Sequence, residues 1–336
     1  MILNAFSVVA AFLAVLRTAL GLAVVVAGVR AIRRARSVRE RGVGEERFHL
    51  LLASCFTLAG LAAVSWPLLY LVLESYVLSW PGVMCVQGVT RIGAASVGPA
   101  SWLPLLLGIL AVTKPLLVFV SGAWLVLHVR NRRGRTDALL VPVLGTLTLA
   151  GLLAVADGAA ETAYLVIPKE EKFLAAGCCA AELPARGVPV PEAPPDQKAA
   201  ITAAFLGVGS GVVLALSAAI RYGGAWLWVA LLLAIASLPL GFLFLEGVAA
   251  PRFLHLPYHH CVFCLARRMP ETLVGIALYV TGALGVGWAV VGRLGGGGLA
   301  SSEDARPERT GEGLLRTARF GYLGALVMAC VMLVNA

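Results

Sequence analysis

The sequence has 336 residues, of which 60% are hydrophobic and only 13% are charged. A soluble domain is about 25% charged, so this composition excludes an ordinary soluble enzyme and indicates a protein of the lipid bilayer. The net charge of +9 does not indicate a nucleic-acid partner. The basic residues lie in short segments between apolar runs, a distribution that reflects membrane topology.

Eight apolar segments, predicted to cross the bilayer as helices, follow one another along the chain. They lie at about 3–29, 50–73, 102–128, 137–156, 199–220, 225–245, 272–291 and 320–334. The fourth can continue as a helix to Ile167, and the fifth contains Gly207 and Gly211 at a spacing that permits close helix packing. The predicted fold is an all-α polytopic membrane protein, with residues 1–336 forming a single integral membrane domain.

Arginine dominates the connecting segments 30–49, 129–137 and 292–319. The positive-inside rule makes these segments cytoplasmic. The outward loops are then 74–101, 157–198 and 246–271, and both termini lie outside. We expect a multi-pass protein of the bacterial cytoplasmic (inner) membrane, whose outward loops face the periplasm.

The stretch from His255 to Cys264 is the densest group of reactive side chains, with three of the five histidines and two of the seven cysteines. Thiolate and imidazole bind soft and borderline metal ions, and this mixture suits copper(I) best and zinc next. Other cysteines lie in the predicted outward loops. The candidate ligands are Cys85, Cys178, Cys179, His255, His259, His260, Cys261 and Cys264.

This pattern predicts a protein that binds, delivers or transports a soft metal ion at its outer face. No Gly-x-x-x-x-Gly-Lys-Ser/Thr phosphate-binding motif occurs in the sequence. We therefore expect it to work beside an energised transporter or a periplasmic metal carrier, without being an enzyme itself.

Two alternatives remain open for the same cysteines. In the first, the Cys261-x-x-Cys264 pair is the redox dithiol of a membrane thiol–disulfide oxidoreductase that uses a quinone between its helices. In the second, the protein is a non-enzymatic membrane subunit and its cysteines form structural disulfides that join the outward loops. Mutation of the histidines distinguishes metal binding from both alternatives, because metal binding needs the imidazoles, whereas a structural disulfide does not and redox exchange depends most on the two cysteines.

Charged side chains within the apolar segments form the second group of candidates. Lys114 and Arg17 lie near the centres of their segments. A basic residue at the bilayer centre costs at least about 2.5–3.5 kcal/mol, so it usually pairs or lines a cavity. Asp157 and Glu161, one helical turn apart, are the expected partners. The carboxylates predicted at the outer mouth of the bundle are Glu74, Asp157, Glu161 and Glu246.

Overall fold

The computed structural model describes residues 4–37, 45–77, 79, 83, 85–90, 92–93, 98–134, 139–168, 194–255, 260–294 and 309–334. Within these ranges eight helices are long and apolar enough to cross a membrane, and there is no strand. The predicted all-α polytopic membrane fold is confirmed. The spans are Ala5–Arg33, Leu52–Val77, Pro99–Arg132, Leu140–Val166, Asp196–Tyr222, Ala225–Leu254, Glu271–Leu294 and Gly311–Val334.

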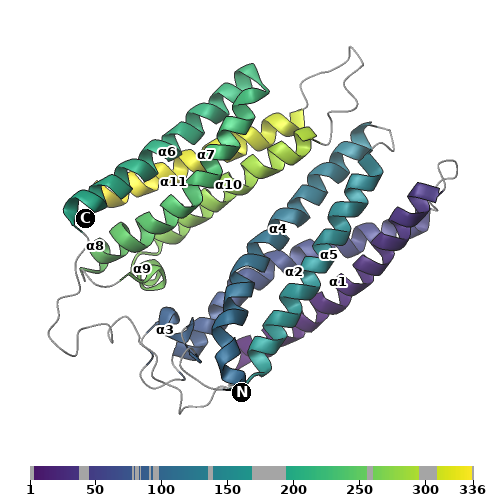
Figure 1. The fold of residues 1–336 in the computed structure, drawn as a ribbon, viewed down its shortest axis with the longest axis horizontal. Coiled ribbons are helices and arrows are strands. Elements are labelled where there is room, and N and C mark those ends of the chain that lie inside the picture. The colour runs from purple at the N-terminus through teal and green to yellow at the C-terminus, as the bar shows by residue number, and fades with distance from the viewer. Residues whose placement is uncertain are drawn as a thin grey trace. The chain divides into compact units, whose positions relative to one another are not determined.

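The chain divides into two compact units, and unit 1 comprises Met1–Cys178. Its elements are α1 (Ala5–Ser37), α2 (Glu45–Val77), the short α3 (Val86–Thr90), the 3-10 turn η1 (Pro99–Trp102), α4 (Leu103–Gly134) and α5 (Leu140–Val166). The N-terminus and α3 lie at the same end of this unit (Figure 1).

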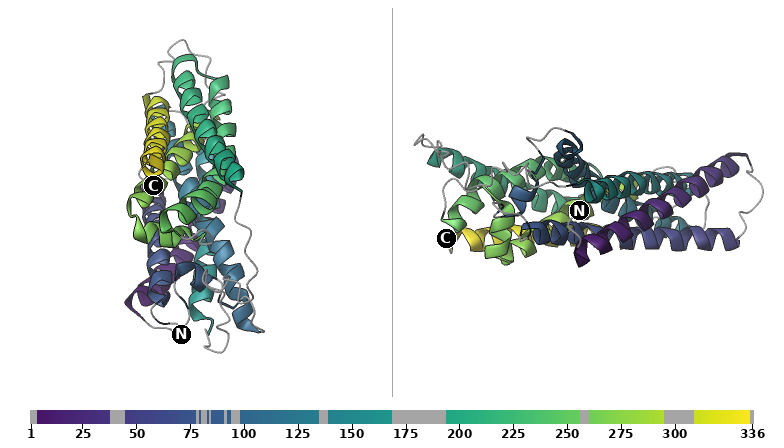
Figure 2. Two further views of the ribbon diagram at one scale, coloured as in Figure 1. Left: turned by 90° about the vertical axis from the view of Figure 1, so that its left-hand side faces the viewer. Right: turned by 90° about the horizontal axis from the view of Figure 1, so that it is seen from below.

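Unit 2 comprises Cys179–Ala336. Its elements are α6 (Pro195–Tyr222), α7 (Ala225–Phe244), the π-helical turn η4 (Leu245–Ala249), α8 (Ala250–Leu254), α9 (Val262–Arg268), α10 (Glu271–Leu294) and α11 (Arg309–Val334). The C-terminal end of α11 lies beside α8, where a guanidinium nitrogen of Arg252 donates to the carbonyl of Leu333 at 3.2 Å (Figures 1 and 2).

The two units have the same packing order. In unit 1 the contacting pairs are α1–α2, α2–α4, α4–α5 and α5–α1, and in unit 2 they are α6–α7, α7–α10, α10–α11 and α11–α6. Each unit is therefore a four-helix bundle in which consecutive long helices pack and the last returns to the first. In each unit the short helices fall between the second and third long helices.

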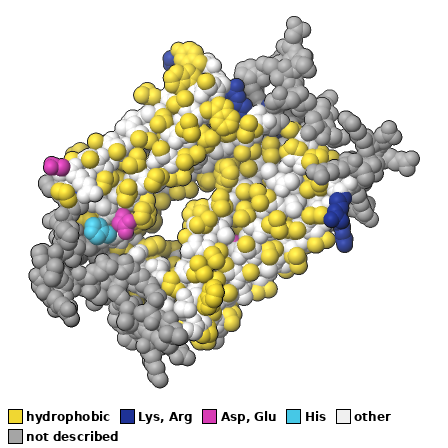
Figure 3. All heavy atoms as spheres, in the orientation of Figure 1, with side chains coloured by type: hydrophobic (Ala, Val, Ile, Leu, Met, Phe, Trp, Pro, Cys, Tyr) yellow, Lys and Arg dark blue, Asp and Glu magenta, His cyan; other side chains and the backbone are white. Residues whose placement is uncertain are grey.

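Hydrophobic side chains cover the long helices, as the surface view shows (Figure 3). Phe12 of α1 is 66% exposed and Leu232 of α7 is 67% exposed. In water, large exposed apolar areas mark interaction sites, whereas in a bilayer they face the lipid tails. The exposed apolar surface is that of a protein solvated by lipid.

Glycines bring α1 and α5 into contact in unit 1. A Cβ added to Gly158 would lie 2.2 Å from the Thr18 hydroxyl oxygen and 2.6 Å from the Ala14 carbonyl oxygen. A Cβ added to Gly151 would lie 2.9 Å from the carbonyl oxygen of Gly21. Small residues at such positions let helix backbones approach within the membrane. This contact fixes the position of α1 beside the polar face of α5.

The spacing of Gly207 and Gly211 permits close helix packing, but neither glycine makes a close contact. An added Cβ at Gly207 meets nothing within 4 Å, and one at Gly211 makes an ordinary contact of 3.4 Å with Leu233. In unit 2 a close backbone contact joins α10 and α11, where a Cβ on Gly321 would lie 2.7 Å from the carbonyl oxygen of Leu278. A Cβ on Gly209 of α6 would lie 2.8 Å from the Leu326 side chain of α11. The spacing of two glycines in the sequence does not determine which face of their helix contacts a neighbouring helix.

Several helices extend into segments predicted to be loops. α5 continues through Asp157 and Glu161 to Val166, in agreement with the predicted continuation to Ile167, so the first ten residues of the segment 157–198 are helical. The sixth span continues through η4 and α8 to Leu254, and α11 begins at Arg309 within the predicted loop 292–319. Polar residues near a helix end lower the hydropathy of the sequence there without ending the helix.

Candidate functional site

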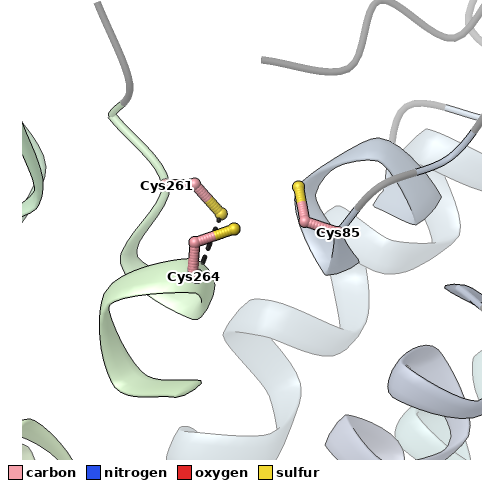
Figure 4. Close-up of side chains that lie close together, drawn as sticks. All are labelled: Cys85, Cys261 and Cys264. Atoms are coloured by element: carbon pink, nitrogen blue, oxygen red, sulfur yellow. Dashed lines mark hydrogen bonds between the residues drawn. The ribbon is translucent and has the colours of Figure 1, made fainter. Parts of the chain in front are cut away.

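The Cys261-x-x-Cys264 pair lies at the start of α9 in unit 2. Cys261 immediately precedes α9, and its Sγ accepts a hydrogen bond of 3.4 Å from the backbone N–H of Cys264. The two Sγ atoms lie within 4.8 Å of each other, and Figure 4 shows both side chains directed to the same side of the turn. Cys261 is buried and Cys264 is half-buried.

This spacing is close to what one metal ion requires. A zinc–sulfur bond is about 2.3 Å, so two thiolates on one ion are separated by at most about 4.6 Å. The first turn of α9 produces the proximity, because residues three apart along a helix share a face. The pair can act as two ligands of one soft metal ion, or as a dithiol.

His260 lies next to Cys261, and its ring is held by unit 2 itself. Its Nδ1 lies 3.0 Å from the backbone carbonyl oxygen of Glu246. A carbonyl only accepts hydrogen bonds, so Nδ1 carries the proton and Nε2 of the neutral ring remains an acceptor. Metal-binding histidines are commonly oriented in this way by a carbonyl on the other nitrogen.

The π-helical turn explains why that carbonyl is available. In η4 the N–H of Ala250 donates to the carbonyl of Leu245, one residue earlier than in an α-helix. The next residue is Pro251, which has no N–H to donate to Glu246. The ring of His260 supplies the donor that the backbone lacks. This role of Glu246 was not predicted from the sequence, because it depends on the backbone carbonyl and not on the carboxylate.

The remaining predicted ligands are placed as follows. His255 ends α8 in a left-handed conformation with φ 54° and is exposed. Cys85 is buried in unit 1 and immediately precedes α3, as Cys261 immediately precedes α9 in unit 2. It is also labelled in Figure 4. Cys178, Cys179 and His259 lie outside the described residues.

Unit 1 contains a buried cluster of four charges, which we call the tetrad: Arg17 of α1, Lys114 of α4, and Asp157 and Glu161 of α5. Their exposed fractions are 0%, 2%, 0% and 1%, respectively. Asp157 and Glu161 were predicted at the outer mouth of the bundle and as partners of Lys114, and the structure buries both of them. The half-buried Glu74 lies near the end of α2, and Glu246 belongs to η4 of unit 2.

Each cation of the tetrad contacts both carboxylates. Lys114 Nζ lies 2.9 Å from an oxygen of Glu161 and 3.3 Å from one of Asp157. Arg17 Nη2 lies 2.6 Å from Asp157 and also pairs with Glu161. The pairing expected for Lys114 is therefore observed, and Arg17 shares the same two acids. With two positive and two negative charges, the tetrad is formally neutral, which reduces the cost of holding charge within the membrane.

The tetrad includes one neutral neighbour that the sequence analysis did not single out. The hydroxyl of Thr113 donates to Asp157 Oδ1 at 2.8 Å, while Oδ2 of the same carboxylate faces the cations. Thr113 precedes Lys114, so one turn of α4 supplies both an N–H and an O–H donor. The only indication of this hydrogen bond in the sequence is that Thr113 is a polar residue within an apolar segment.

Comparison with protein-family models, curated protein sequences and solved structures finds no match to this chain. The interpretation of both sites therefore rests on the chemistry of their residues.

Proposed function

We propose that this membrane protein binds a soft metal ion, copper(I) before zinc, through the thiolates of Cys261 and Cys264. The observation that carries the proposal is their sulfur separation of at most 4.8 Å. His260, next to Cys261 in the sequence, supplies a candidate imidazole whose Nδ1 is already hydrogen-bonded to a carbonyl. Two thiolates and a nitrogen are a ligand set that copper(I) and zinc both accept.

The position of the pair supports a role at one membrane face. The segment between the span ending at Leu254 and the span beginning at Glu271 contains α9 and connects two crossing helices of unit 2. An ion bound there is accessible from one side, and the predicted topology makes this the outer, periplasmic side. We propose that the protein takes up the ion there for delivery or permeation, in cooperation with a metal carrier or an energised transporter.

Cys85 is proposed as a further ligand on grounds of topology. Each unit contains four crossing helices, so the segments after α2 and after α7 face the same side of the membrane. In both segments a buried cysteine immediately precedes a short helix. Cys178, Cys179, His255 and His259 remain candidate ligands from their places in the predicted outward loops.

Metal titration of the reduced, full-length protein tests the proposal. Purified protein in detergent is titrated with copper(I) against a colorimetric chelator, and thiols are counted in parallel. We expect binding in a simple ratio, loss of binding in Cys261→Ser and Cys264→Ser, and unchanged binding in the matched control Cys330→Ser. Cys330 lies on the exposed surface of α11.

Substitution of the histidines provides the sharper outcome. His259→Ala combined with His260→Ala should weaken binding without changing the number of titratable thiols. If the double variant binds copper(I) as tightly as the parent protein, the imidazoles are structural and the proposed ligand set is wrong. Loss of affinity in Cys85→Ser would add Cys85 to the site.

The second candidate function is thiol–disulfide exchange. The hydrogen bond from the Cys264 N–H to Cys261 Sγ favours it, because a donor to sulfur stabilises the thiolate that attacks a disulfide. Reversible oxidation of the pair by a quinone or a soluble disulfide, at a rate unaffected by the histidine substitutions, would support this function over metal binding.

A further inference from the structure

One face of α4 carries polar side chains along the second half of the helix. Lys114, Ser121 and His128 follow at intervals of seven residues, which places them on one face, and all three are buried. Trp124 and Asn131 lie on adjoining positions, and the indole of Trp124 stacks on the imidazole of His128 at 5.3 Å. From Lys114 to Asn131 the helix rises about 25 Å, at 1.5 Å per residue.

Buried polar atoms without hydrogen-bond partners lie along this face and in the tetrad. Among the described residues such atoms are Arg17 Nε, Arg17 Nη1, Ser121 Oγ, Trp124 Nε1 and Asn131 Oδ1. An unpaired group in the hydrocarbon region costs several kcal/mol. The atoms of Arg17, Ser121 and Trp124 lie in the apolar segments 3–29 and 102–128, and Asn131 lies just beyond the second of these. A buried water is stable where it finds two to four polar partners, so these groups are the partners that buried water requires.

Unit 2 shows the contrasting arrangement. Its buried hydroxyl, Ser237, donates to the carbonyl of Ala234 at 2.7 Å and accepts from Tyr279 at 2.7 Å. It also lies 3.1 Å from the Tyr322 hydroxyl. The described part of unit 2 contributes none of the unpartnered atoms. Among the described residues, the buried side-chain N and O atoms without a hydrogen-bond partner all lie in unit 1.

We propose that water connects these atoms into a proton pathway from the tetrad to the C-terminal end of α4. A proton that binds to Glu161 or Asp157 leaves the tetrad with one net positive charge. It passes by hydrogen-bonded water to one nitrogen of His128, while the other nitrogen releases its proton toward Asn131. The carboxylate then returns to its ion pairs, and no electrons are transferred.

His128 is the residue suited to the relay. Among the residues whose burial the structure describes, the other ionisable groups buried by the long helices of unit 1 outside the tetrad are Cys55 and Tyr76 of α2 and Tyr164 of α5. Arg132, exposed, lies one turn beyond His128 on α4. Only imidazole among these side chains ordinarily changes its charge near neutral pH. Metal binding at Cys261 is not required for this pathway.

Proton flux into vesicles tests the pathway. The full chain is reconstituted with an entrapped pH-sensitive dye, and a potassium diffusion potential drives protons inward. We expect faster acidification than in protein-free vesicles, and a fall in the protein-dependent rate of about a hundredfold in His128→Phe, the lower end of what a positioned proton carrier contributes. Ser121→Ala should also slow it, and the matched hydroxyl deletion Ser237→Ala should leave it unchanged.

None of these substitutions removes a charge from the tetrad, so each variant is expected to fold, which circular dichroism and size-exclusion chromatography check. Flux at the protein-free level in the parent protein overturns the proposal. Equal flux in the parent, His128→Phe and Ser121→Ala also overturns it.

Hydration is tested separately by deuterium exchange of the Trp124 indole N–H, assigned by its absence in Trp124→Phe. Exchange within minutes of transfer to deuterated buffer is expected if water reaches the buried nitrogen. Protection for hours would show a dry helix interface and overturn the pathway. This readout does not involve metal, so its failure is distinguishable from failure of the proposed metal site.

Discussion

Removal of the lysine from the tetrad tests the energetics of the buried charges. Lys114→Met replaces a cation that lies 2.9 Å from Glu161 and 3.3 Å from Asp157 with an apolar side chain of similar length. Two carboxylates then share Arg17 alone, and one net negative charge is left uncompensated in the membrane. Breaking a buried ion pair in this way costs about 3–5 kcal/mol, and we expect a loss of that size in the free energy of unfolding.

A second substitution should restore much of this loss. Lys114→Met combined with Glu161→Gln leaves one cation and one carboxylate, so the net charge returns to zero. We expect an interaction energy of up to about 3 kcal/mol between the two positions. The free energy of unfolding is measured in mixed micelles by denaturation with sodium dodecyl sulfate, with helicity as the signal.

Matched controls use acids of similar chemistry outside the tetrad. Glu74→Gln and Glu246→Gln each remove a half-buried carboxylate. Combined with Lys114→Met they should add to it within about 0.5 kcal/mol, as uncoupled sites do. Additive losses for Lys114→Met with both Asp157→Asn and Glu161→Gln would refute the energetic coupling deduced from the contacts.

Three further predictions concern topology, helix packing and pH. Reporters fused after Arg135 and Gly298 should indicate the cytoplasm, and reporters in Pro189–Pro195 or at Ala336 the outside; a cytoplasmic C-terminus would contradict the predicted orientation. Gly158→Ala places a Cβ 2.2 Å from the Thr18 hydroxyl oxygen and should destabilise the protein by about 1–3 kcal/mol, measured in the same denaturation assay. Gly207→Ala, with nothing within 4 Å, is its control and should not destabilise. Metal affinity should decrease as the pH falls, because protons compete for thiolate and imidazole, and calorimetry in two buffers should detect proton release on binding; pH-independent affinity would argue against these ligands.

Hydropathy predicted the spans, because a bilayer requires about 20 apolar residues per helix whatever its neighbours are. The same reasoning predicted that Lys114 pairs with the acids of α5, since an unpaired charge within the bilayer is costly. It did not predict that Asp157 and Glu161 are buried. A carboxylate near the end of a span has the same sequence pattern whether it is solvated by water or paired with a cation. The position of α1 determines which of the two environments the carboxylates have. Its contact with α5 depends on glycines, and their spacing in the sequence does not show which side of the helix they occupy.

In the stretch from His255 to Cys264, the sequence predicted the proximity of the cysteines but not the orientation of His260. The proximity of Cys261 and Cys264 follows from their spacing once the stretch is helical, so the sequence contained it. The orientation of His260 depends on a carbonyl fourteen residues earlier, made available by a shifted helix turn and by Pro251. Side-chain types in a sequence identify candidate ligands, but they do not show which backbone groups have lost their partners.

The distribution of polar groups between the two bundles indicates a division of roles. Both units have the same order of helix contacts, so the bundle itself requires neither a buried charge nor an unpartnered polar atom. Unit 1 nevertheless holds four buried charges and all the unpartnered atoms of the described residues, whereas unit 2 satisfies its buried hydroxyls internally and carries the Cys261–Cys264 pair. Structural pairing alone accounts for the four charges. It does not account for Ser121 Oγ, Trp124 Nε1 and Asn131 Oδ1, which have no hydrogen-bond partner and lie beyond Lys114 on one helix. These three residues are therefore the ones whose substitution distinguishes a proton pathway from an ion pair that only holds helices together.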